Sequence, residues 1–336
     1  MYIVDFFKEP CDVYKIMVKP FKVKISNETL EDIYSKVKKY PWHEMPNDGD
    51  WQYGSNLDYM KEISKYWINE FDWRKYETKI NRFSNFTVKI DNINLHFIHV
   101  KGSGSNSMPL LISHGWPGSI VEFLDIIEQL AHPERFGGKE EDAFDVIAPS
   151  LPGYGFSGRP AHPIGPRKMA DIFNKFMTKN LGYKNYLAQG GDWGATISNW
   201  LGYDHPKTCS GIHINCLTMR HPEGPQNKEE KEWQIKFDKD QKMQDGYRTQ
   251  QATKPQTLSY GMMDSPVGIA AWILEKFYFW SDIKNKDIES VYSKDTLLTN
   301  IMVYIVTKTF NTASWIYYGR REEGGRYFPK DFHQIA

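Results

Sequence analysis

The segment Gly190-Gly191-Asp192-Trp193-Gly194 says most about the architecture of this chain. It follows an apolar run at residues 186–188 and precedes a helix-like run at residues 195–201. Small residues two positions before and two positions after Asp192 have the spacing of a nucleophile elbow, a strained turn from a strand into a helix that exposes one side chain. A carboxylate in that place can attack an electrophilic carbon and form an ester without a neighbouring base. Asp192 is therefore the candidate nucleophile.

An aspartate between a strand and a helix also has a simpler structural interpretation, as the N-cap of the helix. A cap does not need glycine on both sides, so the glycines around Asp192 favour the nucleophile. The helix dipole and the free backbone N–H groups at a helix N-terminus would also stabilise an ionised carboxylate there.

The segment His114-Gly115-Trp116-Pro117-Gly118-Ser119 is the second candidate element of the site. It follows a predicted strand at residues 110–113, and its Gly/Pro turn would direct backbone N–H groups to the same edge of the sheet. The backbone N–H groups of Trp116 and Trp193 are expected to form an oxyanion hole. The side chain of His114 is expected to be a structural hydrogen-bonding group rather than a proton shuttle.

From residue 109 the chain alternates short apolar strands with helices, which predicts a mostly parallel sheet with helices on both faces. The predicted strands are 110–113, 145–148, 186–189 and 211–215, and the predicted helices are 118–130 and 167–181. The part before residue 101 is expected to contain a strand at 21–25, helices at 28–37 and 59–71, and a hairpin over 86–100 that turns at Asp91-Asn92.

Residues 221–310 lose the strand pattern, and helices predicted at 269–280 and 297–310 indicate a helical lid over the strand ends. Residues 319–336 are rich in glycine and charge and are expected to form a loop.

Composition argues against several classes of function. The 336 residues include 42 basic and 42 acidic side chains, which gives no electrostatic case for nucleic acid or an anionic membrane surface. The three cysteines, Cys11, Cys209 and Cys216, have neither the number of a disulfide framework nor zinc-ligand spacing. Acidic residues interrupt the first 20 positions, and no stretch approaches ~18 uncharged apolar residues. The sequence predicts a cytoplasmic protein without a membrane anchor, metal or cofactor.

The two segments described above and the run Ser150-Leu151-Pro152-Gly153-Tyr154-Gly155-Phe156-Ser157 together resemble the microsomal-type epoxide hydrolase family. That family has the α/β-hydrolase fold. The runs at 253–257, 264–268 and 273–277 are similar to its lid, and residues 71–74 are similar to its N-terminal wrapping region. The resemblance implies an N-terminal segment over 1–100, an α/β-hydrolase core over 101–220, a helical lid over 221–318, and the start of a return to the core over 319–336.

The resemblance also implies a chemistry. Asp192 would attack an epoxide carbon and form an alkyl-enzyme ester, which water then hydrolyses to a vicinal diol. Two lid tyrosines, Tyr247 and Tyr317, would protonate the epoxide oxygen, and Tyr318 is the rival to Tyr317 if the helix register differs. A phenol suits this task because its reference pKa of about 10 keeps it protonated at neutral pH.

The chain departs from the family pattern at its C-terminal end. The family hydrolyses the ester with a histidine and an acid on loops after the last core strands, and those strands are not recognisable before Ala336. The last strands are therefore expected to be missing from this sequence, which would impair the second half-reaction. His333, Glu322 and Glu323 are expected to be surface residues rather than replacements.

Two other functions remain open from the residues alone: a haloalkane dehalogenase-like hydrolase, which uses the same aspartate attack, and a non-catalytic binding or regulatory relative. Trp116, Trp193 and Phe156 indicate apolar, bulky epoxides, as in detoxification or the catabolism of aromatic hydrocarbons. The expected partners are a small epoxide and water. The residues leave the oligomeric state open, although a homodimer is common for lid-containing folds of this kind.

Overall fold

The computed structural model describes residues 18–47 and 49–330, so Cys11 and His333 lie outside the described residues. A seven-stranded sheet has the order β1-β2-β3-β5-β4-β6-β7. The strands are β1 (Lys19–Phe21), β2 (Asn85–Ile90), β3 (Ile93–Val100), β4 (Met108–Ser113), β5 (Phe144–Pro149), β6 (Tyr186–Gly190) and β7 (Cys209–Ile214).

Strands β5, β4, β6 and β7 pair in parallel, as the alternation of strands and helices predicts, and β1 to β3 extend the sheet with antiparallel pairs. The hairpin between β2 and β3 turns at Asp91 and Asn92, whose φ angles are 46° and 66°. Aspartate and asparagine tolerate this left-handed backbone better than other non-glycine residues, so the predicted hairpin is confirmed.

The register between β4 and β6 brings the two site segments together. Ser113 lies opposite Gly190 at the ends of these parallel strands. The turn that begins at His114 and the elbow at Asp192 therefore leave the sheet side by side.

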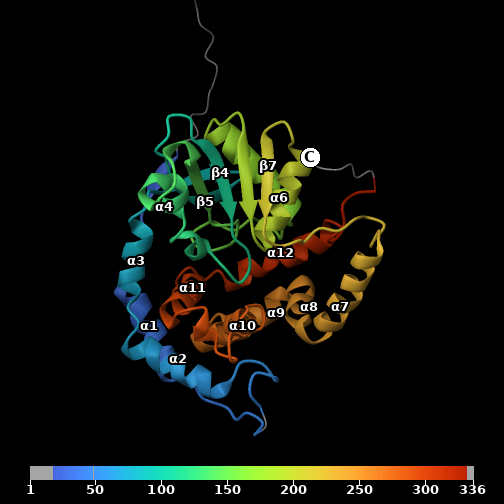
Figure 1. Ribbon diagram of the computed structural model, residues 1–336. Helices are drawn as coiled ribbons and strands as arrows, with labels where there is room; N and C mark the ends of the chain where they lie inside the picture. Colours follow the sequence, from blue (N-terminus) through green and yellow to red (C-terminus); the bar gives the residue numbers. More distant parts are fainter. Residues whose placement is uncertain (1–17, 48, 331–336) are drawn as a thin grey trace, which may run out of the picture.

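The helices of the N-terminal part and the core are α1 (Asn27–Lys38), α2 (Leu57–Asn69), α3 (Trp73–Asn81), α4 (Ile127–Ala131), α5 (Pro166–Lys175) and α6 (Trp193–Asp204). Helix α1 is capped by Ser26, whose side chain accepts a hydrogen bond from the Thr29 N–H. Helices cover both faces of the sheet, with α4 and α6 on opposite sides in Figure 1.

The predicted strand at 21–25 is wrong beyond Phe21, where β1 ends. The Val23 N–H donates to Oδ1 of Asn81 at 2.9 Å, and the Val23 carbonyl accepts from Nδ2 of the same side chain at 2.8 Å. The Ile25 N–H donates to Glu77 at 2.6 Å. Side chains of α3 thus satisfy the backbone groups that a neighbouring strand would otherwise satisfy.

Two predicted helices differ in detail. The helix expected at 118–130 is a short 3₁₀ segment (Ile120–Phe123) followed by α4. The N–H groups of Leu124 and Ile126 donate to carbonyls three residues earlier, as in a 3₁₀-helix. These tighter turns separate the 3₁₀ segment from α4. The helix expected at 167–181 begins as α5 and changes at Phe176 to a π-helical turn.

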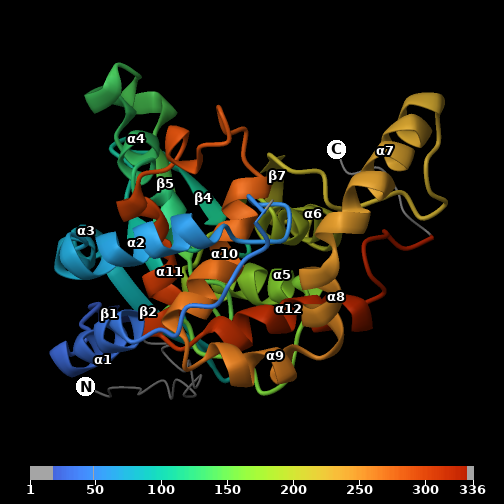
Figure 2. The same ribbon diagram turned by 90° about the horizontal axis from the view of Figure 1, so that it is seen from below.

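The helices of the lid are α7 (Lys228–Gln244), α8 (Gly246–Thr253), α9 (Pro255–Met262), α10 (Pro266–Phe279), α11 (Lys294–Val306) and α12 (Phe310–Glu322). Figure 1 shows α12 passing directly beneath the sheet, with α8, α9 and α10 on its far side. Figure 2, from below, shows these helices covering that end of the core. The lid therefore closes over the edge at which β4 and β6 end.

The N-terminal helices hold the lid in place. The hydroxyls of Tyr66 on α2 and Tyr76 on α3 both donate to the carboxylate of Asp295 on α11, at 2.9 and 2.6 Å. The Ser55 hydroxyl donates to the carbonyl of Ala271 on α10 at 2.6 Å. These contacts connect parts of the chain that are more than 200 positions apart.

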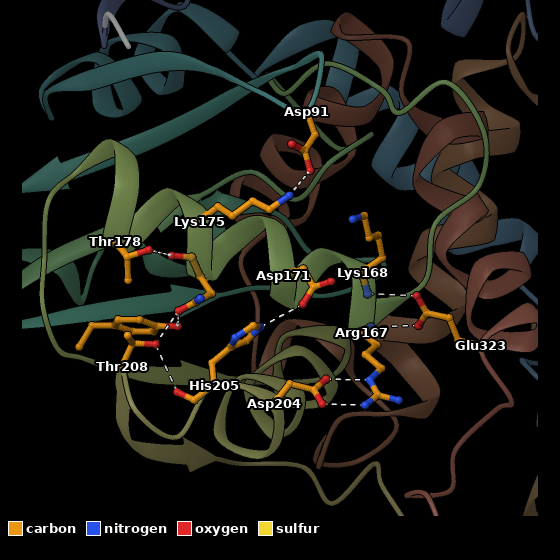
Figure 3. A network of polar contacts seen from close by, with 12 residues as sticks. Asp91, Arg167, Lys168, Asp171, Lys175, Thr178, Asp204, His205, Thr208 and Glu323 are labelled. Atoms are coloured by element: carbon orange, nitrogen blue, oxygen red, sulfur yellow. Dashed lines mark hydrogen bonds and ion pairs between the residues drawn. The ribbon is translucent and has the colours of Figure 1, made fainter. Parts of the chain in front are cut away.

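The end of α12 is docked on the core rather than forming a loop. The prediction of a loop from residue 319 is wrong for the last turn of this helix, which ends at Glu322. Glu323 is exposed, as predicted, and its carboxylate accepts the backbone N–H groups of Arg167 and Lys168 at 3.0 Å each (Figure 3). It thereby satisfies free N–H groups at the start of α5 and fixes the position of α12.

Candidate active site

The elbow has the strained backbone that its sequence predicts. Asp192 has φ 50° and ψ −119°, in a region that L-residues rarely adopt. A Cβ atom on Gly190 would overlap the backbone of Gly194, and a Cβ atom on Gly194 would overlap the carbonyl of Ser113. Only glycine lets α6 start this close to β4 and β6, so the two glycines hold Asp192 in its exposed position.

The turn after β4 contacts the carboxylate of Asp192 directly. The Trp116 N–H donates to Oδ1 of Asp192 at 2.7 Å, and the Trp193 N–H also hydrogen-bonds this carboxylate. A Cβ atom on Gly115 would overlap the same carboxylate, so glycine is required there too. The two N–H groups expected to form an oxyanion hole thus converge on one carboxyl group.

The carboxylate of Asp192 is accessible from the cavity but surrounded by protein elsewhere. Desolvation by this protein raises the pKa of Asp192 to about 6, against the lowering effect of the Trp116 and Trp193 N–H groups and of the Arg320 charge. The group is therefore ionised above a pH of about 6, which is the form that a nucleophile needs.

The phenols of Tyr247 on α8 and Tyr317 on α12 lie beside the elbow. The Tyr247 ring stacks on Trp116 with centroids 5.2 Å apart and planes 7° apart. The Tyr317 ring stands perpendicular to Trp193 at 4.7 Å and to Tyr247 at 5.8 Å. Burial is the largest cause that raises the pKa of both phenols, and the charge of Asp192 adds to it. Both phenols are therefore protonated at neutral pH.

The register of α12 distinguishes Tyr317 from its neighbour. Tyr317 is buried and lines the cavity, whereas the Tyr318 ring lies 4.3 Å from the guanidinium of Arg321 and is not among the lining residues. Phe156, which the sequence suggested as a wall of the site, packs elsewhere, against Phe21 at 5.8 Å and His96 at 5.2 Å.

A cavity of about 440 Å³ contains all three candidate catalytic side chains. Its described lining comes from α6, α7, α8 and α12 and from the segments that follow β6, β7, α10 and α12, namely Asp192, Trp193, Thr196, Cys216, Leu217, Thr218, Arg220, Phe237, Gln241, Tyr247, Arg248, Trp280, Tyr317, Arg320 and Arg326. The helices that carry the two tyrosines, α8 and α12, lie below the sheet in Figure 1.

His114 is buried, and both of its ring nitrogens have a backbone partner. Its Nδ1 is 3.1 Å from the Gly115 carbonyl, and its Nε2 accepts the Leu151 N–H at 3.1 Å. These two contacts match the structural role expected of it. Within residues 18–47 and 49–330 there is no cluster of side chains that could hold a metal ion, and no helix has the length and apolarity to span a bilayer.

Four arginines of the cavity wall, Arg220, Arg248, Arg320 and Arg326, were not identified from the sequence. A signal existed for two of them, because Arg248 follows Tyr247 directly and Arg320 lies three residues after Tyr317 on the same helix. Glu122 was also missed. Its carboxylate accepts the backbone N–H groups of Gly115 and Ser119 and so supports the turn that carries the Trp116 N–H.

Comparison with known families shows what the chain is similar to. Residues 18–123 match the family described as the epoxide hydrolase N terminus, and residues 108–270 match the alpha/beta hydrolase fold family. Epoxide hydrolase 1 of Sus scrofa is 36% identical over 327 residues, which cover 89% of this chain and 72% of the pig protein.

Solved structures are similar over most of the chain as well. Juvenile hormone epoxide hydrolase from the silkworm Bombyx mori is 30% identical with a TM-score of 0.78, covering 95% of this chain and 78% of that one. The epoxide hydrolase of Aspergillus niger is 29% identical with a TM-score of 0.79, covering 90% of this chain and 79% of that one. By these matches in sequence and in structure, the chain belongs to the epoxide hydrolase family and has its α/β-hydrolase fold.

Proposed function

We propose that this enzyme opens an epoxide ring through attack by Asp192 and protonation by Tyr247 and Tyr317. A carboxylate oxygen of Asp192 forms a bond to one epoxide carbon while the bond from that carbon to the ring oxygen breaks. One phenol gives its proton to the ring oxygen, and the second donates a hydrogen bond to it. The product of this step is a hydroxyalkyl ester of Asp192.

The observation that carries this proposal is that one cavity holds an accessible carboxylate and two protonated phenols. The Trp116 N–H holds Oδ1 of Asp192 at 2.7 Å and so orients the carboxylate toward the cavity. An epoxide placed between the elbow and the phenols would have its carbon near Asp192 and its oxygen near the proton donors. That is the arrangement that ring opening requires.

Hydrolysis of the ester to a vicinal diol is the second half of the proposed reaction. Water adds to the ester carbonyl, the N–H groups of Trp116 and Trp193 stabilise the oxyanion, and collapse releases the diol and restores Asp192. The described residues that line the cavity include no histidine that could activate this water. The contacts of the described residues therefore support the ring-opening half most directly.

A single turnover with excess enzyme and styrene oxide in water labelled with heavy oxygen tests the proposal. Attack by Asp192 transfers a protein oxygen to the diol, so the diol of the first turnover is unlabelled and the peptide that contains Asp192 becomes labelled. If the ester persists, the intact protein instead gains the mass of the epoxide. A labelled diol in the first turnover, with Asp192 unlabelled and unmodified, would contradict the mechanism.

The matched variant is Asp192→Asn, which keeps the size of the side chain and removes its charge. We expect neither adduct nor label in this variant, together with an unchanged circular dichroism spectrum. An adduct that persists on another residue would refute the assignment of the nucleophile.

A further inference from the structure

Four arginines lie on the wall of the cavity that contains Asp192, and we call Arg220, Arg248, Arg320 and Arg326 the arginine cluster. They come from the loop after β7, from α8, from α12 and from the segment after α12. Asp192 is the single carboxylate among the described residues that line this cavity. Positive charge therefore exceeds negative charge on the wall itself.

Most of the arginine cluster has no carboxylate partner within the described part of the chain. Arg248 forms an ion pair with Asp245 at 2.5 Å. Arg320 donates instead to the Thr218 carbonyl at 3.2 Å, and Arg220 donates to the side-chain amide oxygen of Gln234 at 2.9 Å. Nε of Arg220 is buried and has no hydrogen-bond partner among residues 18–47 and 49–330.

Aromatic rings rather than acids hold these guanidinium groups in place. Arg320 lies 5.1 Å from the ring of Trp193, next to the nucleophile. Arg220 lies 4.3 Å from the ring of Trp233 and 5.0 Å from that of Phe237, and Arg326 lies 5.6 Å from the ring of Phe237. Stacking fixes the plane of a guanidinium and leaves its N–H edge free to bind an anion.

The electrostatics of the cluster agree with this geometry. Burial lowers the pKa of Arg320 to about 10, and the charges of Arg326 and Arg248 add to the effect. A bound anion would relieve this repulsion, and a carboxylate can accept two parallel N–H bonds from one guanidinium.

We propose that the cavity takes epoxides that carry a carboxylate, with the carboxylate on the arginine cluster and the epoxide ring at Asp192. This inference rests on the proposed ring-opening function and adds the class of substrate. The aromatic side chains of Trp193, Trp280 and Phe237 in the same wall suit an apolar group carried by the same molecule.

The test compares 3-phenylglycidate with 3-phenylglycidamide, a neutral compound of nearly the same size. The readout is the second-order rate constant for epoxide consumption with enzyme in excess. We expect the carboxylate to react at least about tenfold faster than the amide, as expected for a charge-assisted contact. Arg220→Gln and Arg326→Gln should each reduce this ratio, and added salt should reduce it as well. Arg135→Gln, on an exposed segment away from the cavity, is the control and should leave the ratio unchanged.

A binding measurement separates this inference from the catalytic proposal. Quenching of tryptophan fluorescence gives the affinities of Asp192→Asn for the unreactive ligands cinnamate and cinnamamide. We expect cinnamate to bind at least about tenfold more tightly, and the difference to shrink when Arg220→Gln or Arg326→Gln is added. If neither epoxide is consumed but cinnamate is preferred, the ring-opening proposal fails and the anion site stands. Equal affinities, or equal rates for the two epoxides, would overturn the anion site.

Discussion

The backbone N–H of Trp116 donates a 2.7 Å hydrogen bond to Oδ1 of Asp192, and this bond joins two segments that are 76 positions apart. It forms because β4 and β6 are paired so that Ser113 lies opposite Gly190. The sheet register therefore fixes the orientation of the proposed nucleophile, and the lid places the two proposed proton donors beside it.

Gly115→Ala tests this contact, because the added methyl group would overlap the carboxylate of Asp192. We expect the single-turnover rate of ring opening to fall by about 10²-fold, the usual cost when a reacting group is displaced by about 1 Å. Gly261→Ala is the control, since a Cβ atom there meets open space on α9. Rates of epoxide consumption check the prediction, and an unimpaired Gly115→Ala enzyme would contradict the tight contact.

The two phenols are tested by Tyr247→Phe and Tyr317→Phe. Each change removes one donor to the epoxide oxygen, and the double variant should slow ring opening by about 10²–10⁴-fold. Tyr318→Phe removes a hydroxyl outside the described cavity lining and should leave the rate unchanged. A double variant with the rate of the unmodified enzyme in single-turnover mass spectrometry would exclude the two phenols as acids.

The elbow could be predicted from the sequence because its glycines answer a local steric requirement. The turn that exposes the carboxylate of Asp192 has no room for a Cβ atom at Gly190 or at Gly194. The spacing of these two glycines in the sequence therefore indicates the turn. The lid tyrosines had no comparable signal. The chain contains 20 tyrosines, and only the family resemblance indicated Tyr247 and Tyr317.

Other features depend on contacts that no local pattern encodes. The last turn of α12 resembles a loop in its sequence, yet a Cβ atom on Gly319 would overlap the backbone at Ile164 and Gly165. That close approach is tertiary and outweighs the weak helix propensity of glycine. Arg248 and Arg320 lie close in sequence to the candidate tyrosines, but the arginine cluster as a whole comes from four separate segments that only the fold brings together.

The pH dependence of ring opening should follow the ionisation of Asp192. Its pKa of about 6 means that the attacking carboxylate is lost as the pH falls, so the rate should rise from pH 5 to pH 7 and then level off. The phenols remain protonated through this range because burial raises their pKa values.

Arg320→Gln removes a charge that lowers the pKa of Asp192, so the midpoint of the pH–rate profile should move to higher pH. Single-turnover rates between pH 4.5 and 8.5 measure the midpoint, and a midpoint shifted to lower pH would contradict this assignment.

The docking of α12 on α5 makes a prediction for stability as well as for activity. Glu323 accepts the N–H groups of Arg167 and Lys168 at 3.0 Å, so Glu323→Ala leaves two N–H groups at the start of α5 without this partner (Figure 3). We expect the free energy of unfolding to fall by about 1 kcal/mol, the usual cost of losing a helix cap. Glu322→Ala is the matched control one residue earlier. Its carboxylate pairs with the exposed Arg321 at 2.9 Å, and such surface pairs contribute about 0–1 kcal/mol. Urea unfolding of both variants checks the difference.

Because α12 carries Tyr317, Glu323→Ala should also slow ring opening more than Glu322→Ala does. Equal effects of the two variants on stability and rate would show that this contact does not position the helix.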